Sequence, residues 1–140
     1  MANNVKELMD TDWRVQASAT LQADTNSGTG LLLIDISGLN RWVAGSKLAV
    51  SKVFWSIGSG VATLMWNGTG GGGATTEDAI VMNGGGSYGM TAGQPALLSN
   101  AVGTNAVTGD LRIVNASAVT GTIIVECTKH VSGAGVGWSG

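Results

Sequence analysis

The 140-residue sequence predicts an all-β protein, an antiparallel β-sandwich or jelly roll of about eight short strands with Gly-rich loops and extended termini. Three observations lead to this prediction. Short apolar runs recur at intervals of roughly 8 to 15 residues, a spacing typical of sandwich strands. Twenty-three glycines and a single proline provide turn residues between these runs. No interval has room for a crossover helix of 3.6-residue period, which excludes a βαβ fold.

The central element is the stretch Leu48–Trp66, in which two apolar runs flank Gly58-Ser59-Gly60. The first run is apolar on both alternating sides, as expected for a strand that is covered on both faces. A three-residue connection with glycine at either end can supply the positive φ angles of a tight turn. We therefore expect a β-hairpin here, with Trp55 and Trp66 in the core.

The N-terminal residues are expected to differ from this body. Residues 4–12 could form one or two helical turns, with Asn4 as the N-cap and Glu7 three residues later. Because so short a helix is unstable alone, the segment is either a frayed leader or an arm that orders against a neighbouring subunit. From Arg14 to Leu21 polar and apolar residues alternate without a fault, which predicts a half-buried strand. The predicted division is an N-terminal arm (residues 1–13), a β-sandwich domain (14–130) and a C-terminal arm (131–140).

The other strands are predicted from short apolar runs bounded by turn residues. Residues 25–30 and 67–73 are expected to be loops because they consist of Gly, Ser, Thr and Asn. Leu111–Val114 and Thr122–Lys129 are close in the chain and are expected to pair with each other. The remaining predicted strands are Leu31–Ile36, Ala79–Met82, Ser87–Met90 and Ala96–Leu98, with a short strand or irregular rim at Leu39–Val43.

Composition excludes several classes of partner. Charged residues make up only 11% of the chain and the net charge is -2, so no basic surface is expected to attract nucleic acid or anionic lipid. No stretch reaches the ~20 apolar residues of a membrane span, and Lys6, Glu7 and Asp10 interrupt the region where a signal peptide would be apolar. We expect a cytoplasm-like compartment. Few charges combined with a positive mean hydropathy predict that apolar surface is buried against other subunits.

The sequence offers no complete catalytic, cofactor or metal site, and we predict that the protein is not an enzyme. His130 is the only histidine and Cys127 the only cysteine. Three residues apart on a strand, they point to opposite faces and cannot form a Cys–His pair. They are also too few to hold zinc. Since Cys127 alternates with apolar residues, it is expected to be a buried thiol.

The carboxylates and glycines carry no clear motif. Asp10 and Asp12, like the other acidic residues, are interpreted as solvated loop charges. An oxygen-ligated cation at Glu77 and Asp78 stays open as an alternative. Residues 68–73 satisfy the G-x-G-x-x-G pattern formally, but a short strand follows where a phosphate-binding motif needs a helix.

The five tryptophans supply the candidate contacts with a partner. Besides Trp55 and Trp66, the others lie near the ends of the predicted sheets, where an indole can cap the core or anchor an interface. The predicted partner-interface residues are these three tryptophans together with two apolar residues of the N-terminal arm: Trp13, Trp42, Trp138, Leu8 and Met9.

Three features together carry a family resemblance. They are residues 50–56 followed by 61–66, the glycine run of residues 83–86, and the succession of residues 108–113 and 121–126. With these features the chain resembles small tailed-bacteriophage virion proteins, in particular capsid decoration (cement) proteins and related jelly-roll accessory proteins. The resemblance implies a sandwich that binds the outer surface of the major capsid protein lattice, as a dimer or trimer, and reinforces the shell without catalysis. It would then be located on the virion after assembly in the host cytoplasm.

Two other functions compete with this one. A tail, neck or baseplate protein of the same β class would assemble with tail components, and a carbohydrate-binding module would present an exposed Trp to glycans. An enzyme is the remaining alternative.

Overall fold

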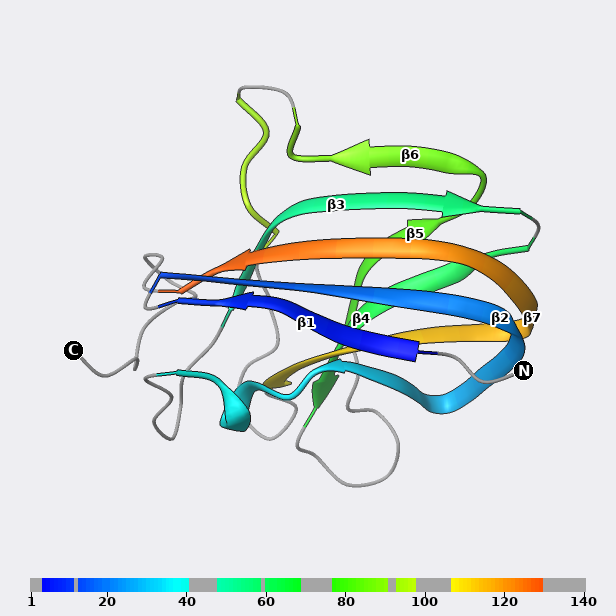
Figure 1. The fold of residues 1–140 in the computed structure, drawn as a ribbon, viewed down its shortest axis with the longest axis horizontal. Coiled ribbons are helices and arrows are strands. Elements are labelled where there is room, and N and C mark those ends of the chain that lie inside the picture. The colour runs from blue at the N-terminus through cyan, green and yellow to red at the C-terminus, as the bar shows by residue number, and fades with distance from the viewer. Residues whose placement is uncertain are drawn as a thin grey trace.

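The computed structural model describes residues 4–11, 13–40, 48–58, 60–68, 77–90, 93–97 and 107–129. These residues contain one 3₁₀ helix, η1, no α-helix and hence no helix that could cross a membrane. They form seven strands (Figure 1): β1 (Asn4–Asp10), β2 (Arg14–Ile34), β3 (Ala49–Ile57), β4 (Ala62–Gly68), β5 (Glu77–Met82), β6 (Gly85–Tyr88) and β7 (Val107–Thr128), with η1 at Ile36–Gly38.

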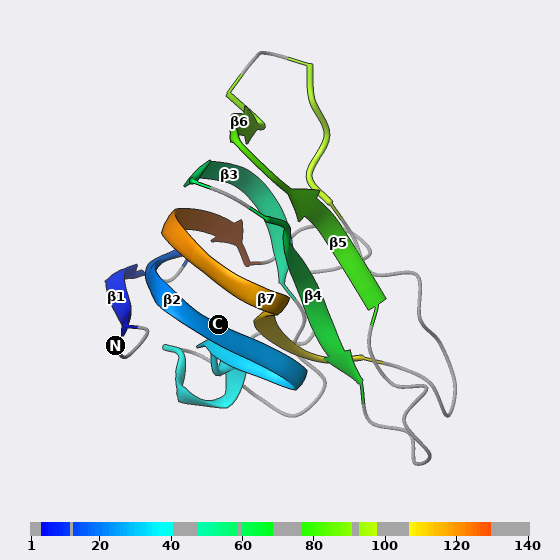
Figure 2. The ribbon, with the colours of Figure 1, turned by 90° about the vertical axis from the view of Figure 1, so that its right-hand side faces the viewer.

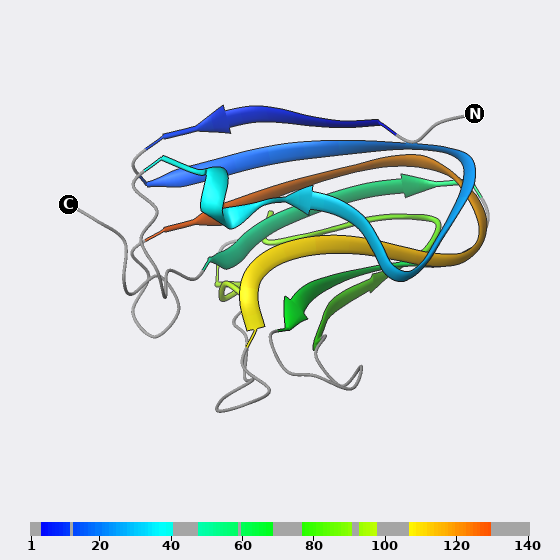
Figure 3. The ribbon, with the colours of Figure 1, turned by 90° about the horizontal axis from the view of Figure 1, so that it is seen from below.

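Two long, bent strands organise the whole fold. β2 has 21 residues, β7 has 22, and they run antiparallel to each other. Residues 14–22 of β2 pair with 120–128 of β7, and residues 31–34 pair with 111–113. Between these two segments the register shifts repeatedly, and both strands curve round together at one end of the molecule (Figure 3). Each long strand therefore belongs to two layers.

The first layer consists of β1, residues 14–22 of β2, residues 120–128 of β7, β3 and β6, side by side in that order (Figure 1). The second layer consists of the other halves of β2 and β7 together with β4 and β5, which lie apart from β3 and β6 (Figure 2). All of the pairs are antiparallel. The predicted antiparallel β-sandwich is confirmed, whereas the strand order does not confirm a jelly roll.

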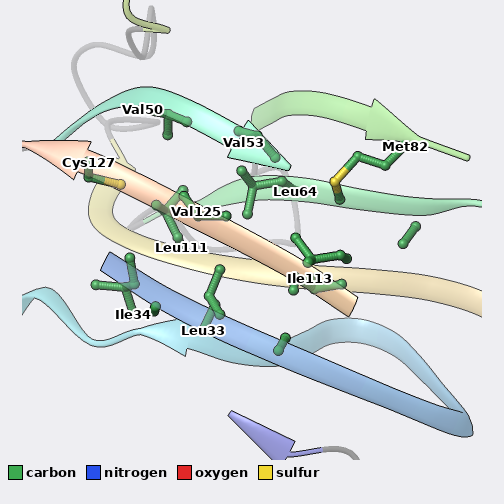
Figure 4. Packing of buried hydrophobic residues seen from close by; sticks show 14 of the residues in the cluster. Leu33, Ile34, Val50, Val53, Leu64, Met82, Leu111, Ile113, Val125 and Cys127 are labelled. Carbon is green, nitrogen blue, oxygen red and sulfur yellow. The ribbon is translucent and has the colours of Figure 1, made fainter. Parts of the chain in front are cut away.

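The core lies between the layers because alternate residues of each strand point inward. Leu64, Leu111 and Ile113 of the second layer lie opposite Val53 and Val125 of the first (Figure 4), and all five are fully buried. Each buried side chain of this size contributes about 1.5–3 kcal/mol. Trp66 is buried in the same cluster, as predicted, and Trp55 is half-buried against it.

The hairpin predicted for Leu48–Trp66 is wrong in its pairing. Both strands exist and Gly60 has a φ of 83°, but β3 pairs with β6 and β7 in the first layer. β4 pairs with β5 and with the other half of β7 in the second layer. The glycine-rich connection carries the chain from one layer to the other, since each strand finds a better partner in β7 than in its neighbour along the chain.

The pairing predicted between Leu111–Val114 and Thr122–Lys129 is also wrong. Both segments belong to the single strand β7, and each pairs with different partners in a different layer. Likewise, residues 25–30 are extended within β2 instead of forming a loop. The glycines and polar residues of these stretches allow the strands to bend without ending them.

The helical turns predicted for residues 4–12 are wrong. Residues 4–10 form β1, which is paired with β2 from Asn4 opposite Thr20 to Asp10 opposite Val15, with one irregularity between Glu7 and Met9. A neighbouring strand that offers a full ladder of hydrogen bonds outweighs a weak local helix preference. The C-terminal arm, residues 131–140, lies outside the described residues.

Candidate partner-binding surfaces

The turn between β1 and β2 holds Trp13 in a fixed position. The Oγ1 atom of Thr11 accepts hydrogen bonds from the backbone N–H groups of Trp13 (3.3 Å) and Arg14 (3.0 Å). The Thr11 N–H donates to the carbonyl of Arg14 at 2.8 Å. The Trp13 carbonyl accepts from the Lys129 N–H at 2.7 Å. Trp13 is nevertheless 65% exposed, so a hydrogen-bonded backbone presents a large apolar residue to the surroundings.

A buried lysine fastens this turn to the body of the sandwich. The side chain of Lys129 is fully buried, and its Nζ donates to Asp10 Oδ1 (2.7 Å) and to the carbonyls of Thr11 (2.6 Å) and Asn40 (2.8 Å). All three donors of the ammonium group are thereby satisfied. The other Asp10 oxygen accepts from the Asn40 N–H at 2.8 Å. The interpretation of Asp10 as a solvated loop charge is therefore wrong.

Three of the five predicted interface residues belong to this hairpin. Leu8 on β1 is 46% exposed, Met9 is half-buried, and Trp13 is exposed at the turn. Trp42 and Trp138 lie outside the described residues. Leu8 and Met9 thus lie on β1 and Trp13 in the turn that follows it, and the role of these residues toward a partner stays a prediction.

The structure describes only some of the side chains that were considered for catalysis or metal binding. Cys127 is fully buried, as predicted, and its burial together with the nearby Glu126 carboxylate raises the pKa of its thiol well above the ordinary range. His130 lies outside the described residues, as do the side chains of Glu77 and Asp78. Within the part of the chain that the structure describes, no group of three or more His, Cys, Asp or Glu side chains could hold a metal ion.

The outer face of the first layer is mainly polar. Register places Gln16, Glu126 and Lys52 in one row across β2, β7 and β3. Glu126 Oε2 lies 3.9 Å from Arg14 Nη1 and 4.0 Å from Lys52 Nζ, so its charge lies between two cations. The neighbouring rows are Ser18, Ile124 and Phe54, and Thr20, Thr122 and Ser56. Along these rows on β2, β7 and β3 only Phe54 and Ile124 are apolar, and Met9 of β1 continues the first row next to Gln16.

The outer face of the second layer has the opposite character. Register places Leu32, Arg112 and Met65 in one row across β2, β7 and β4, and Asp78 of β5 is in register with Met65 at the end of that row. The next row across β7, β4 and β5 is Val114, Thr63 and Val81. We call Leu32, Arg112, Met65, Val114, Thr63 and Val81 the Arg112 face. Val81 is 58% exposed, Leu32 is 36% exposed, and the other four are half-buried. Four of the six are apolar, although they point away from the core.

The Arg112 face is not predicted by the sequence. The six residues come from four strands, and only the pairing of those strands brings them together. One residue in the sequence does point to this face. In the strand Leu111–Val114, Val114 is apolar although it lies on the side that does not face the core. Such a strand has apolar residues on both sides and is normally covered on both.

Comparison with known proteins adds no relative: no family model, curated protein or solved structure matches the chain.

Proposed function

We propose that this chain is a structural virion protein that binds the outer surface of a bacteriophage capsid lattice and stabilises the shell. The observation that carries the proposal is the Arg112 face. A sandwich that only had to remain dissolved would place polar residues on both outer faces, as the first layer does. Apolar side chains on regular, well-paired strands of an outer face are typical of a surface that another protein covers.

The pattern resemblance to capsid decoration proteins supplies the kind of partner. A decoration protein acts by mass action, since each bound copy stabilises the assembled lattice by its own binding free energy. Such a role requires a rigid body and a preformed contact surface. The two-layer sandwich supports the first, and the Arg112 face together with the exposed side chains of Leu8 and Trp13 supports the second. Dimer or trimer formation on the lattice belongs to the same proposal.

The test is binding to shells. The purified chain is added to expanded empty capsids assembled from the major capsid protein of a phage genome that encodes it, and occupancy is measured by co-sedimentation and cryo-imaging. Saturable, lattice-ordered binding is expected. Isolated tails from the same phage serve as the control: binding to tails without binding to shells would replace the proposal by a tail, neck or baseplate role.

The exposed Trp13 also fits a carbohydrate-binding module. Its indole could stack on a sugar ring, because the backbone of the turn holds it out from the surface. A titration with soluble glycans that shifts the tryptophan fluorescence, and fails to do so in Trp13→Ser, would favour this second function.

A further inference from the structure

The contact between Lys129 and Asp10 brings an amine and a carboxyl group together in an enclosed place. Lys129 is the one charged residue that is buried in the described part of the chain, and its side chain is fully enclosed, whereas the Asp10 side chain is 15% exposed. Nζ lies 2.7 Å from Oδ1, and the carboxyl carbon of Asp10 is one bond beyond that oxygen. The fold therefore holds two groups that can react with each other in direct contact.

The hydrogen bonds of the ammonium group fix the orientation of its nitrogen. Two N–H groups donate to the backbone carbonyls of Thr11 (2.6 Å) and Asn40 (2.8 Å), and the third donates to Asp10 Oδ1. Transfer of this third proton to the carboxylate replaces two enclosed charges by a neutral amine and a neutral carboxylic acid, which removes the cost of burying the charges. The lone pair left on Nζ then points toward the Asp10 carboxyl group, because the other two N–H groups stay on their carbonyls.

The Asp10 carboxyl group is polarised by the backbone on its other side. Its Oδ2 atom accepts the N–H of Asn40 at 2.8 Å. This donor is in place to stabilise the negative charge that develops on Oδ2 when an amine attacks the carboxyl carbon. The same N–H fits the product, since it can stay bonded to the oxygen of an amide. The partial exposure of Asp10 leaves a departing water molecule a route to solvent.

We propose that Lys129 and Asp10 condense to an intramolecular amide bond in the folded protein. The Nζ–Cγ bond forms and the Cγ–Oδ1 bond breaks. Oδ1 leaves as water with two of the three ammonium protons, and the third proton stays on the amide nitrogen, where it can still be donated to a backbone carbonyl. The reaction needs no oxidant, reductant or further reactant, and the proposal does not rest on the proposed function.

The amide bond fastens the first strand of the described chain to the last. β1 lies at the edge of the first layer, and among the described residues it pairs only with β2 and contributes no fully buried side chain to the core. Such an edge strand is the part of a sheet that opens most easily. A covalent bond from Asp10 to the end of β7 prevents its release, and it also restricts the unfolded chain by closing a long loop.

The mass of the intact full-length chain, measured after denaturation, tests the proposal. We expect the purified protein to be lighter than its sequence by one water molecule. Trypsin is then expected not to cleave after Lys129 and to release residues 7–14 joined to residues 113–140 as one branched peptide. A chain of full mass whose two peptides are separate would overturn the proposal, because the pair would then be ionic only.

Two controls distinguish this bond from other losses of water. Lys129→Arg keeps a cation that can donate to the same acceptors, but a guanidinium that stays charged does not attack a carboxyl group, so this variant is expected to have its full mass. If Lys129→Arg also lost water, the loss would come from another site, such as an aspartate that cyclises onto its own backbone, and the proposal would be overturned. Circular dichroism checks that the variant is folded, and if it is not, the branched peptide of the unmodified chain decides.

Lys52 is the matched control within the same protein. Its Nζ lies 4.0 Å from Glu126 Oε2, but its side chain is 48% exposed. Water surrounds this lysine and keeps it charged, so we expect trypsin to cleave after Lys52 as usual. A link between Lys52 and Glu126 as abundant as the one at Lys129 would show that the buried geometry is not the cause, and would also overturn the proposal.

Discussion

The Nζ atom of Lys129 lies 2.7 Å from Oδ1 of Asp10, and this buried ion pair joins the end of β7 to the end of β1 across 119 positions of sequence. The same ammonium group holds the carbonyls of Thr11 and Asn40. One side chain therefore closes this end of the sandwich and fixes the turn that presents Trp13.

Removing this lysine is expected to destabilise the fold strongly. Lys129→Met leaves the Asp10 carboxylate and two carbonyls without their donor, and loss of one partner of a buried pair costs about 3–5 kcal/mol. Urea denaturation measures the free energy of unfolding. Lys6→Met, which removes an exposed lysine from β1, should change it by less than about 0.5 kcal/mol. Equal effects of the two substitutions would show that the buried pair has no special role.

Gly121 is expected to tolerate no side chain. A Cβ atom there would lie 2.2 Å from the Ser56 carbonyl oxygen and 2.9 Å from the Ile57 Cα, so β3 and β7 would have to separate. We expect Gly121→Ala to cost about 1–3 kcal/mol, measured by thermal or urea unfolding. Gly85→Ala is the matched control on β6, where a Cβ would meet nothing within 4 Å. A Gly121→Ala protein as stable as the control would contradict the close approach of the two strands.

The position of Trp13 is expected to depend on Thr11 rather than on its own indole. Thr11→Val removes the oxygen that accepts the N–H groups of Trp13 and Arg14, and we expect a loss of about 1 kcal/mol. Trp13→Ser should leave the free energy of unfolding within about 0.5 kcal/mol of its original value, because the indole is exposed. If Trp13→Ser lowered the free energy of unfolding more than Thr11→Val does, the result would mean that Trp13 packs against the body of the protein.

Because its thiol is buried, Cys127 is expected to make the protein less stable at alkaline pH. Its pKa in the folded protein is raised by burial and by Glu126, whereas in the unfolded chain the thiol ionises near pH ~8.5. Above that pH the unfolded state loses a proton that the folded state keeps. The contribution of the neutral thiol is thus complete below about pH 8.5 and declines as the pH rises, by up to about 1.4 kcal/mol per unit.

Urea unfolding at several pH values between about 8 and 10, with reductant present, checks this slope. Cys127→Ala should start from a lower stability and show a flatter dependence on pH. If the free energy of unfolding fell equally steeply with pH in the unmodified protein and in Cys127→Ala, the pH dependence would come from groups other than Cys127.

The sequence predicted the strands well where the signal is local. The alternation from Arg14 to Leu21 identifies the residues that the structure buries, and the apolar runs around Val53 and Ile123 predict strands that the structure confirms. It failed where the answer depends on pairing between distant segments. The Gly58–Gly60 connection has the composition of a hairpin turn, and only the competing partner β7 decides that it crosses between the layers.

The candidate surfaces also divide into features that depend on neighbouring residues, which the sequence predicts, and features that depend on pairing between distant segments, which it does not. Trp13 could be predicted as an exposed apolar residue because its neighbours in sequence, Asp12 and Arg14, are charged. The setting of Arg112 could not be predicted, since Leu32 and Met65 are brought to it by long-range register. The charge of Lys129 also gave no hint of burial, because its acceptors come from two distant parts of the chain, residues 10–11 and Asn40.

The shared strands β2 and β7 have a consequence for how the protein forms in the cell. Val15 pairs with Cys127, so the first half of β2 acquires its main partner only after the residues up to 128 have left the ribosome. Until then the apolar stripe of residues 15–21 has no sheet to cover it, and it is open to pairing with other nascent chains. Neither layer can close early, because each contains half of both strands. We therefore expect the two layers to form together once β7 has been synthesised, and not one after the other.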